Sequence, residues 1–231
     1  MIDPCTNPPS LPLIAPSILA ADFANLGDDC QAVMDAGADF LHVDIMDGHF
    51  VPNLSMGPAV CGAVRDACPD TFLDVHLMVT DPQAYFKPFA DHGANLISFH
   101  IEVVESAQHA IDLAGEVREL GCRPGIVINP PTDHRMLMGT LEAFDLYLLM
   151  SVHPGFGGQA FIPDVLAKAE WIRTQLAPHQ RLEIDGGIGL TTASQALDAG
   201  IDTLVAGSAI FGQPRERWGS IIEQLRDPEV R

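Results

Sequence analysis

Basic residues are scarce in this chain of 231 residues, which has 12 lysines and arginines against 31 aspartates and glutamates and a formal net charge of −19. Nucleic-acid binding needs Lys and Arg to neutralise phosphates, so this balance argues against a nucleic-acid partner. It argues equally against binding to an anionic membrane surface. A small phosphate ester is not excluded, because backbone N–H groups hold phosphate without positive side chains.

Cysteine pairs and long apolar runs are missing as well. The five cysteines are an odd number and include no C-x-x-C pair, so a reducing cytoplasm is expected rather than a disulfide framework. No apolar run reaches the ~18 residues of a membrane span. Residues 1–12 lack the regions of a signal peptide and hold four prolines, which predicts a flexible leader. Residues 13–231 show no linker, which predicts a single domain.

Short apolar runs alternate with segments of helical periodicity along the rest of the chain. The apolar runs cover residues 13–19, 40–46, 72–78, 95–101, 124–128, 145–152, 181–185 and 203–206. Helices are expected near 22–36, 58–67, 82–92, 106–120, 133–141, 163–176, 191–199 and 214–226. Strands that alternate with helices form a parallel sheet, and eight such units favour an α/β fold of the (β/α)8 TIM-barrel type. A doubly wound open sheet is the alternative, disfavoured because no G-x-G-x-x-G follows the first strand.

Side chains that bind metal ions stand at the ends of three of these runs. His42 and Asp44 are two residues apart, so on a strand they point to the same face. His76 lies two residues before the end of the third run, and Asp185 ends the seventh. The active site of a barrel lies at the carboxyl ends of its strands, so these side chains are expected to meet there. Two imidazoles and two carboxylates suit zinc or another first-row divalent ion, although each alone is also an ordinary hydrogen-bonded group.

Glycine-rich segments follow the last three runs, at residues 155–158, 186–187 and 207–208. Phosphate groups in barrels bind at the loops after strands seven and eight, and glycine lets the backbone approach an anion closely. One such segment is typical of any turn. Three on neighbouring strand ends favour a phosphate site.

Three methionines, Met46, Met78 and Met150, lie at or just past strand ends. Methionine usually fills gaps in a core, but here the positions favour an apolar lining of the mouth. His100, at the end of the fourth run, is expected to be a hydrogen-bonded polar residue rather than a ligand.

Lysine is nearly absent, with Lys87 and Lys168 the only two in the chain. Both lie in expected helices, whereas a Schiff-base aldolase needs a lysine at a strand end. No G-x-S-x-G sequence provides a hydrolase nucleophile. The remaining interpretation is metal-assisted chemistry on a sugar phosphate, with Asp44 and Asp185 as acid and base.

Six segments in this order resemble the ribulose-phosphate 3-epimerase family, over about residues 14–211. They are APSIL (15–19), HVDIMDGHFVPN (42–53), DVHLMV (74–79), MSVHPGFGGQ (150–159), EIDGGI (183–188) and AGSAIF (206–211). The resemblance implies a barrel of the ribulose-phosphate-binding type. It implies interconversion of D-ribulose 5-phosphate and D-xylulose 5-phosphate through an enediolate.

The same resemblance implies roles for individual residues. One divalent ion per subunit (zinc, iron, manganese or cobalt) would be held by His42, Asp44, His76 and Asp185. Asp44 and Asp185 would transfer protons at C3 from opposite faces. Substrate would contact Ser17, His76, Gly155, Phe156, Gly157, Gly158, Gly186, Gly187, Gly207 and Ser208. The expected partner is a small sugar phosphate, with no nucleic acid and no membrane, and the expected assembly is a homo-oligomer in the cytoplasm.

One residue departs from the family pattern. His153 stands where the family usually has asparagine, just before the glycine-rich loop, which leaves the substrate detail open. Residues 45–54 also resemble the hexulose homologue, allulose-6-phosphate 3-epimerase. That enzyme, a metal-dependent decarboxylase on the same barrel and a non-catalytic sugar-phosphate-binding barrel are the alternatives.

Overall fold

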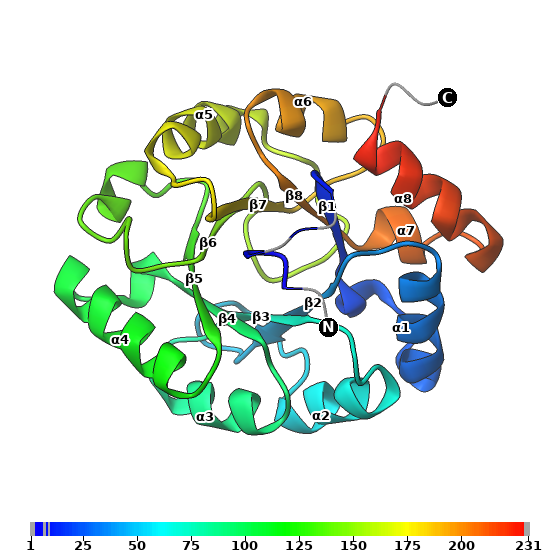
Figure 1. The fold of residues 1–231 in the computed structure, drawn as a ribbon, viewed down its shortest axis with the longest axis horizontal. Helices are drawn as coiled ribbons and strands as arrows, with labels where there is room; N and C mark the ends of the chain where they lie inside the picture. Colours follow the sequence, from blue (N-terminus) through cyan, green and yellow to red (C-terminus); the bar gives the residue numbers. More distant parts are fainter. Residues whose placement is uncertain (1–2, 7, 9, 229–231) are drawn as a thin grey trace.

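Eight parallel strands form a ring enclosed by helices in the computed structural model, which describes residues 3–6, 8 and 10–228 (Figure 1). The strands are β1 (Leu13–Pro16), β2 (Leu41–Met46), β3 (Leu73–Met78), β4 (Leu96–His100), β5 (Arg123–Ile128), β6 (Leu146–Met150), β7 (Arg181–Asp185) and β8 (Thr203–Ala206). The α-helices are α1 (Leu26–Asp35), α2 (Pro58–Ala67), α3 (Gln83–Asp91), α4 (Ala107–Glu119), α5 (Leu166–Gln175), α6 (Ala193–Asp198), α7 (Ser208–Phe211) and α8 (Trp218–Arg226).

The order of the strands confirms the predicted barrel. From β2 to β8 each strand pairs in parallel with the next, and β8 pairs in parallel with β1. Strands β1 and β2 are joined by an isolated parallel bridge between Ser17 and His42. This bridge brings the two ends of the sheet together, so an open doubly wound sheet is ruled out.

Some of the expected helices begin with a 3₁₀ turn, so that their α-helical part starts later than the apolar periodicity indicated. The expected helix at 22–36 starts as a 3₁₀ turn, Phe23–Asn25, whose N-cap Asp22 accepts a hydrogen bond from the backbone N–H of Ala24. The expected helix at 214–226 likewise starts with a 3₁₀ turn, Arg215–Arg217, before α8. Helix α7 was not expected, because four residues are too few to show a helical period.

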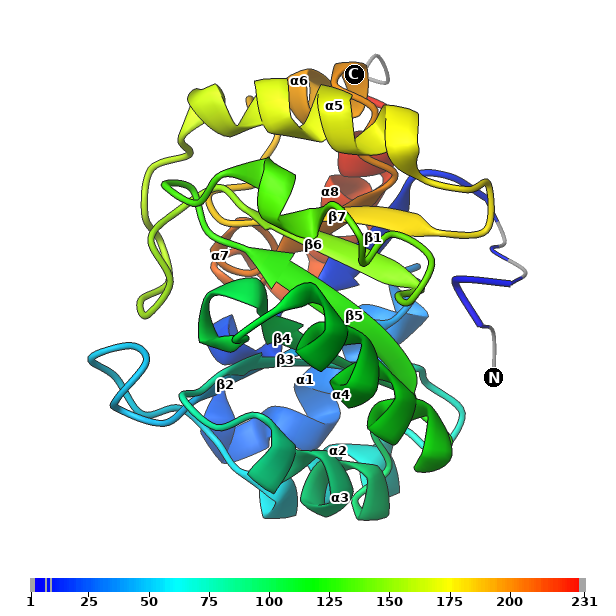
Figure 2. The same cartoon turned by 90° about the vertical axis from the view of Figure 1, so that its left-hand side faces the viewer.

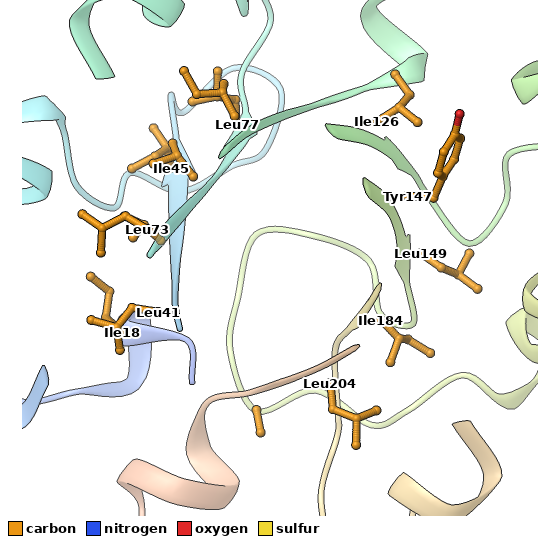
Figure 3. Packing of buried hydrophobic residues seen from close by; sticks show 14 of the residues in the cluster. Ile18, Leu41, Ile45, Leu73, Leu77, Ile126, Tyr147, Leu149, Ile184 and Leu204 are labelled. Carbon is orange, nitrogen blue, oxygen red and sulfur yellow. The ribbon is translucent and has the colours of Figure 1, made fainter. Parts of the chain in front are cut away.

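Both faces of the strands are buried, which explains their continuous apolar sequences. Side chains such as Leu41, Leu73 and Leu149 point outward from the ring of strands and pack in the large core cluster shared with the helices (Figure 3). Inward-facing residues such as Leu13 and Leu148 form a separate cluster inside the barrel. The polar inward-facing residues are therefore exceptions that need a functional or hydrogen-bonding reason.

The two ends of the barrel differ. The loops after β2 and β6 project on one side in Figure 2, and the N-terminal segment lies on the opposite side. There Cys5 is 2% exposed and belongs to the interior cluster, while Asp3 forms an ion pair with Arg123 at the start of β5. The described residues of the leader thus contact the barrel floor. Residues 1–2, 7 and 9 lie outside the described part, and the division into a flexible leader and one domain stays a prediction.

Within residues 3–6, 8 and 10–228, none of the helices combines the length and the apolar character that crossing a bilayer demands.

Candidate active site

The four predicted metal ligands come together at the carboxyl ends of three strands. His42 and Asp44 face inward from β2, and the register of the sheet sets Asp44 beside His76 of β3. Asp185, the last residue of β7, completes the group. One ligand atom from each of the four residues lies within 4.8 Å of every other.

The ring of His42 is held in one orientation by a carboxylate. Its Nδ1 lies 2.6 Å from Oδ2 of Asp74, which faces inward from β3 below His76. Its Nε2 is buried, has no hydrogen-bond partner and lies 3.3 Å from Oδ1 of Asp44. Burial lowers the pKa of His42, but the charges of Asp44 and Asp74 outweigh it and raise the pKa well above its usual value. The raised pKa favours a protonated ring in the metal-free protein, and a cation bound at Nε2 would take the place of the proton there.

The ring of His76 is fully buried and contacts groups on both sides. Nδ1 lies 3.1 Å from Oδ1 of Asp44, and Nε2 lies 2.9 Å from Nε2 of His100. His100 Nδ1 in turn lies 3.0 Å from Oε2 of Glu102. Burial is the main cause that lowers the pKa of His76 to about 4, so this ring is neutral at pH 7 and able to bind a metal ion.

The two carboxylates have opposite electrostatic environments. Asp44 accepts a 2.5 Å hydrogen bond from the Ser17 hydroxyl, and despite burial the neighbouring His42 and His76 lower its pKa. Burial and the Asp44 charge raise the pKa of Asp185 to about 7. A pair of acids with separated pKa values is the arrangement that acid–base chemistry requires.

The donor set fits a divalent cation. Two imidazole nitrogens and two carboxylate oxygens are ligands that zinc, iron, manganese and cobalt accept. The unpartnered Nε2 of His42 points among these oxygens, and a buried polar atom without a partner is costly unless something binds it. The residues present therefore fit the predicted centre.

A second acidic group lies deeper in the barrel. Both side-chain oxygens of Glu183 are buried without a hydrogen-bond partner, close to Asp74 and His42. Burial, together with the Asp74 charge, raises the pKa of Glu183 well above its usual value. Because His42 Nδ1 is occupied by Asp74, this group does not offer a complete alternative to the first centre.

A cavity of about 370 Å³ opens above the four ligands. This volume suits a small phosphorylated sugar. The cavity is lined by residues from the strand ends and the glycine-rich loops: Ser17, Leu19, Ala20, Asp44, Met46, Met78, Met150, Val152, Pro154, Gly155, Phe156, Gly157, Gly158, Gln159, Asp185, Gly186, Gly187, Ile188, Val205, Gly207 and Ser208. The predicted substrate-contacting and lining residues are all in this set except His76, which is fully buried behind Asp44.

Several residues around the ligands were not singled out from the sequence. Asp74 and Glu183 stand two residues before His76 and Asp185, so the alternation of a strand turns them to the same inward face. That alternation was the available signal. Glu102 follows β4 in the 3₁₀ turn Ile101–Val103, where no periodic pattern marks it.

Sequence comparison identifies relatives of this chain over most of its length. The profile of the Ribulose-phosphate 3 epimerase family matches residues 13–211. Ribulose-phosphate 3-epimerase 2 of Cupriavidus necator is 48% identical over 223 residues, covering 93% of this chain and 91% of that protein. The ribulose-phosphate 3-epimerase of Escherichia coli K12 is 43% identical over 217 residues, covering 93% of this chain and 94% of that protein.

Solved structures share the barrel at much lower identity. The 3-keto-L-gulonate-6-phosphate decarboxylase of Vibrio cholerae superposes with a TM-score of 0.73 at 16% identity, covering 95% of this chain and 97% of that one. The α subunit of tryptophan synthase from Legionella pneumophila gives a TM-score of 0.63 at 15% identity, covering 94% of this chain and 92% of that one. These similarities show the fold alone. The profile match and the sequence relatives at 43–48% identity lead to one assignment: this chain is a member of the ribulose-phosphate 3-epimerase family.

Proposed function

We propose that this protein is a metal-dependent ribulose-phosphate 3-epimerase, which interconverts D-ribulose 5-phosphate and D-xylulose 5-phosphate. The observation that carries the proposal is the convergence of Asp44 and Asp185 beside two imidazoles, under a cavity of about 370 Å³. Epimerisation at C3 requires one group to take a proton and another to return one to the opposite face. Two carboxylates from β2 and β7 meet that requirement.

The separated pKa values of the two carboxyl groups support a division of roles. The low pKa of Asp44 makes it an anion at pH 7, ready to accept the C3 proton of ribulose phosphate. Asp185, whose pKa is raised, retains a proton more readily and is suited to return one from the other side. The roles exchange in the reverse direction. His42, Asp44, His76 and Asp185 would hold a divalent cation, which would supply Lewis-acid stabilisation of the negative charge that develops on the substrate.

The glycine-rich loops are suited to hold the phosphate. Gly186 and Gly187 have positive φ angles of 119° and 63°, and residues other than glycine rarely adopt such backbone angles. A Cβ at either position would lie 2.6 Å from a neighbouring atom, in Val152 and Phe161 respectively. Both glycines line the cavity, so the backbone there is exposed without a side chain, which is how an anion is bound without Lys or Arg.

The wider setting follows from the same proposal. The substrate is a small sugar phosphate, and the net charge of −19 disfavours nucleic acids and anionic membranes as partners. A cytoplasmic homo-oligomer, active in pentose phosphate metabolism, is the setting we propose. Sedimentation of the purified protein tests the assembly.

One experiment tests the reaction. The metal-loaded protein is incubated with ribulose 5-phosphate in D₂O, and the products are followed by NMR. Xylulose 5-phosphate carrying deuterium at C3 is the expected result. Binding without exchange would instead identify a non-catalytic barrel, and loss of carbon dioxide from a sugar acid phosphate would identify a decarboxylase. Faster turnover of allulose 6-phosphate than of ribulose 5-phosphate would identify the hexulose enzyme.

A further inference from the structure

Four side chains at the carboxyl ends of β2, β3 and β4 form a continuous chain of contacts, in the order Asp44, His76, His100 and Glu102. The three contacts are 3.1 Å (Asp44 Oδ1 to His76 Nδ1), 2.9 Å (His76 Nε2 to His100 Nε2) and 3.0 Å (His100 Nδ1 to Glu102 Oε2). Both histidines are fully buried. Water therefore does not replace a missing partner on either ring.

This chain has too few protons to form three hydrogen bonds. A carboxylate only accepts, and a neutral imidazole offers one N–H and one lone pair. The two rings supply two protons, whereas three contacts need three. Both rings are 0% exposed, and a buried imidazole without a full set of partners is disfavoured as a cation, so neutral rings are the appropriate count. One of the three contacts must consist of two acceptors that face each other.

The surroundings of the two ends decide where the unsatisfied contact falls. At one end, Glu102 Oε1 accepts a 2.8 Å hydrogen bond from the backbone N–H of Asn129, which fixes Oε2 as the acceptor for His100. At the other end, Asp44 and His76 face the candidate metal centre together with His42 and Asp185. A cation bound there would be ligated by both acceptors, and its charge would remove the repulsion between them. The unsatisfied contact therefore belongs at Asp44 and His76.

We propose that Glu102 and His100 are positioning residues, which direct the Nδ1 lone pair of His76 at the metal ion. Glu102 accepts a hydrogen bond from the Nδ1–H of His100. Nε2 of His100 therefore carries no proton and accepts a hydrogen bond from the Nε2–H of His76. Nδ1 of His76 is then left without a proton and available as a ligand. The inference rests on the metal centre of the proposed function and adds the residues that set the tautomer of one ligand.

The ring of His100 is also held in place from the loop after β2. The ring of Phe50 packs on it with centroids 4.6 Å apart, and the His76 ring meets it edge to edge through the Nε2–Nε2 contact. Rotation of His100 is restricted by the Phe50 ring and by the contacts at its two nitrogens. Its two nitrogens therefore remain directed at Glu102 and His76.

The substitution Glu102→Gln tests the proposal by reversing the chain. The amide oxygen remains the acceptor for the Asn129 N–H, so the amide NH₂ faces Nδ1 of His100. His100 must then carry its proton on Nε2 and donate it to His76, and His76 must carry its proton on Nδ1. All three contacts become hydrogen bonds, but the ligand nitrogen is blocked. Affinity for Zn²⁺ or Co²⁺ should fall about 10- to 100-fold in a chelator competition.

Two further measurements separate positioning from a general structural role. In metal-free protein, ¹⁵N NMR should show the His76 proton on Nε2 in the wild type and on Nδ1 in Glu102→Gln. The Tm of the metal-free variant should be no lower than that of the wild type, because its chain is fully hydrogen-bonded. Glu105→Gln is the matched control: it removes the same charge from an exposed residue nearby and should leave affinity and tautomer unchanged.

His100→Phe is a second variant, which keeps an aromatic ring, although a larger one, and removes the acceptor for His76; its metal affinity should fall as well. If Glu102→Gln keeps the wild-type metal affinity and the wild-type His76 tautomer, this inference is overturned, but the metal centre of the proposed function is not. A wild-type protein that binds none of Zn²⁺, Co²⁺ and Mn²⁺ would overturn the metal centre itself, and this inference with it.

Discussion

The side-chain amide of Asn53 donates a hydrogen bond to the backbone carbonyl oxygen of Gly155, with an N–O distance of 2.8 Å. Asn53 lies in the loop after β2 and Gly155 in the loop after β6, the two loops that project together in Figure 2. The bond joins the loop that follows the strand carrying His42 and Asp44 to the glycine-rich loop that lines the cavity. The two loops are therefore expected to act as one unit when substrate binds.

Replacing Asn53 by aspartate should weaken substrate binding without affecting the metal centre. Aspartate keeps the side-chain oxygen that accepts the Leu54 N–H but cannot donate to Gly155. A single hydrogen bond contributes about 0.5–1.5 kcal/mol, so KM for ribulose 5-phosphate should rise about 2- to 10-fold. Steady-state kinetics measures the effect. An unchanged KM would show that the two loops move independently.

Asp185→Asn should abolish most of the turnover and leave the fold intact. The amide cannot exchange a proton with C3, and loss of a general acid–base group costs about 10²- to 10⁴-fold in kcat. Thermal unfolding and circular dichroism of the metal-free variant check the fold. Asp198→Asn, on the exposed face of α6, is the control and should retain full activity. Near-normal kcat in Asp185→Asn would remove Asp185 from the mechanism.

Metal affinity should rise with pH up to neutrality. Burial raises the pKa of Asp185 from 3.8 to about 7, so folding of the metal-free protein favours the protonated acid. The stability from this group is present below the unfolded pKa and is lost as pH rises toward 7. A metal ion needs the carboxylate, so its affinity should increase about tenfold per pH unit below 7 for this proton alone. Calorimetric titrations from about pH 5.5 to 7.5 test this, and a constant affinity would contradict it.

His153→Asn should have little effect on the reaction. The His153 side chain is exposed and does not line the cavity, and the backbone carbonyl oxygen of His153 accepts a hydrogen bond from the side-chain amide of Gln159. Surface substitutions of this kind change stability by about 0.5 kcal/mol or less. We expect kcat/KM within about twofold of the wild type. A rise in KM above tenfold would instead mean that His153 reaches the phosphate.

The barrel and the grouping of the metal ligands could be predicted from the sequence because both depend on local patterns. Apolar runs that alternate with helices define the strands, and alternation within a strand puts His42 and Asp44 on one face. The contacts that orient those ligands could not be predicted in this way. The pairing of His42 with Asp74, and of His76 with His100, depends on the register between neighbouring strands. Register becomes visible only when the sheet is assembled.

The seam between β1 and β2 has a consequence for how activity reports on folding. Ser17 makes the backbone bridge that joins β1 to β2, and its hydroxyl donates to the carboxylate of Asp44. Closure of the ring and alignment of the proton-accepting group are thus performed by the same residue. A molecule whose first strand has slipped by one position turns Ser17 away and loses both contacts. Enzymatic activity in this protein therefore reports only those molecules in which β1 and β2 are correctly paired, because molecules with a shifted first strand are inactive.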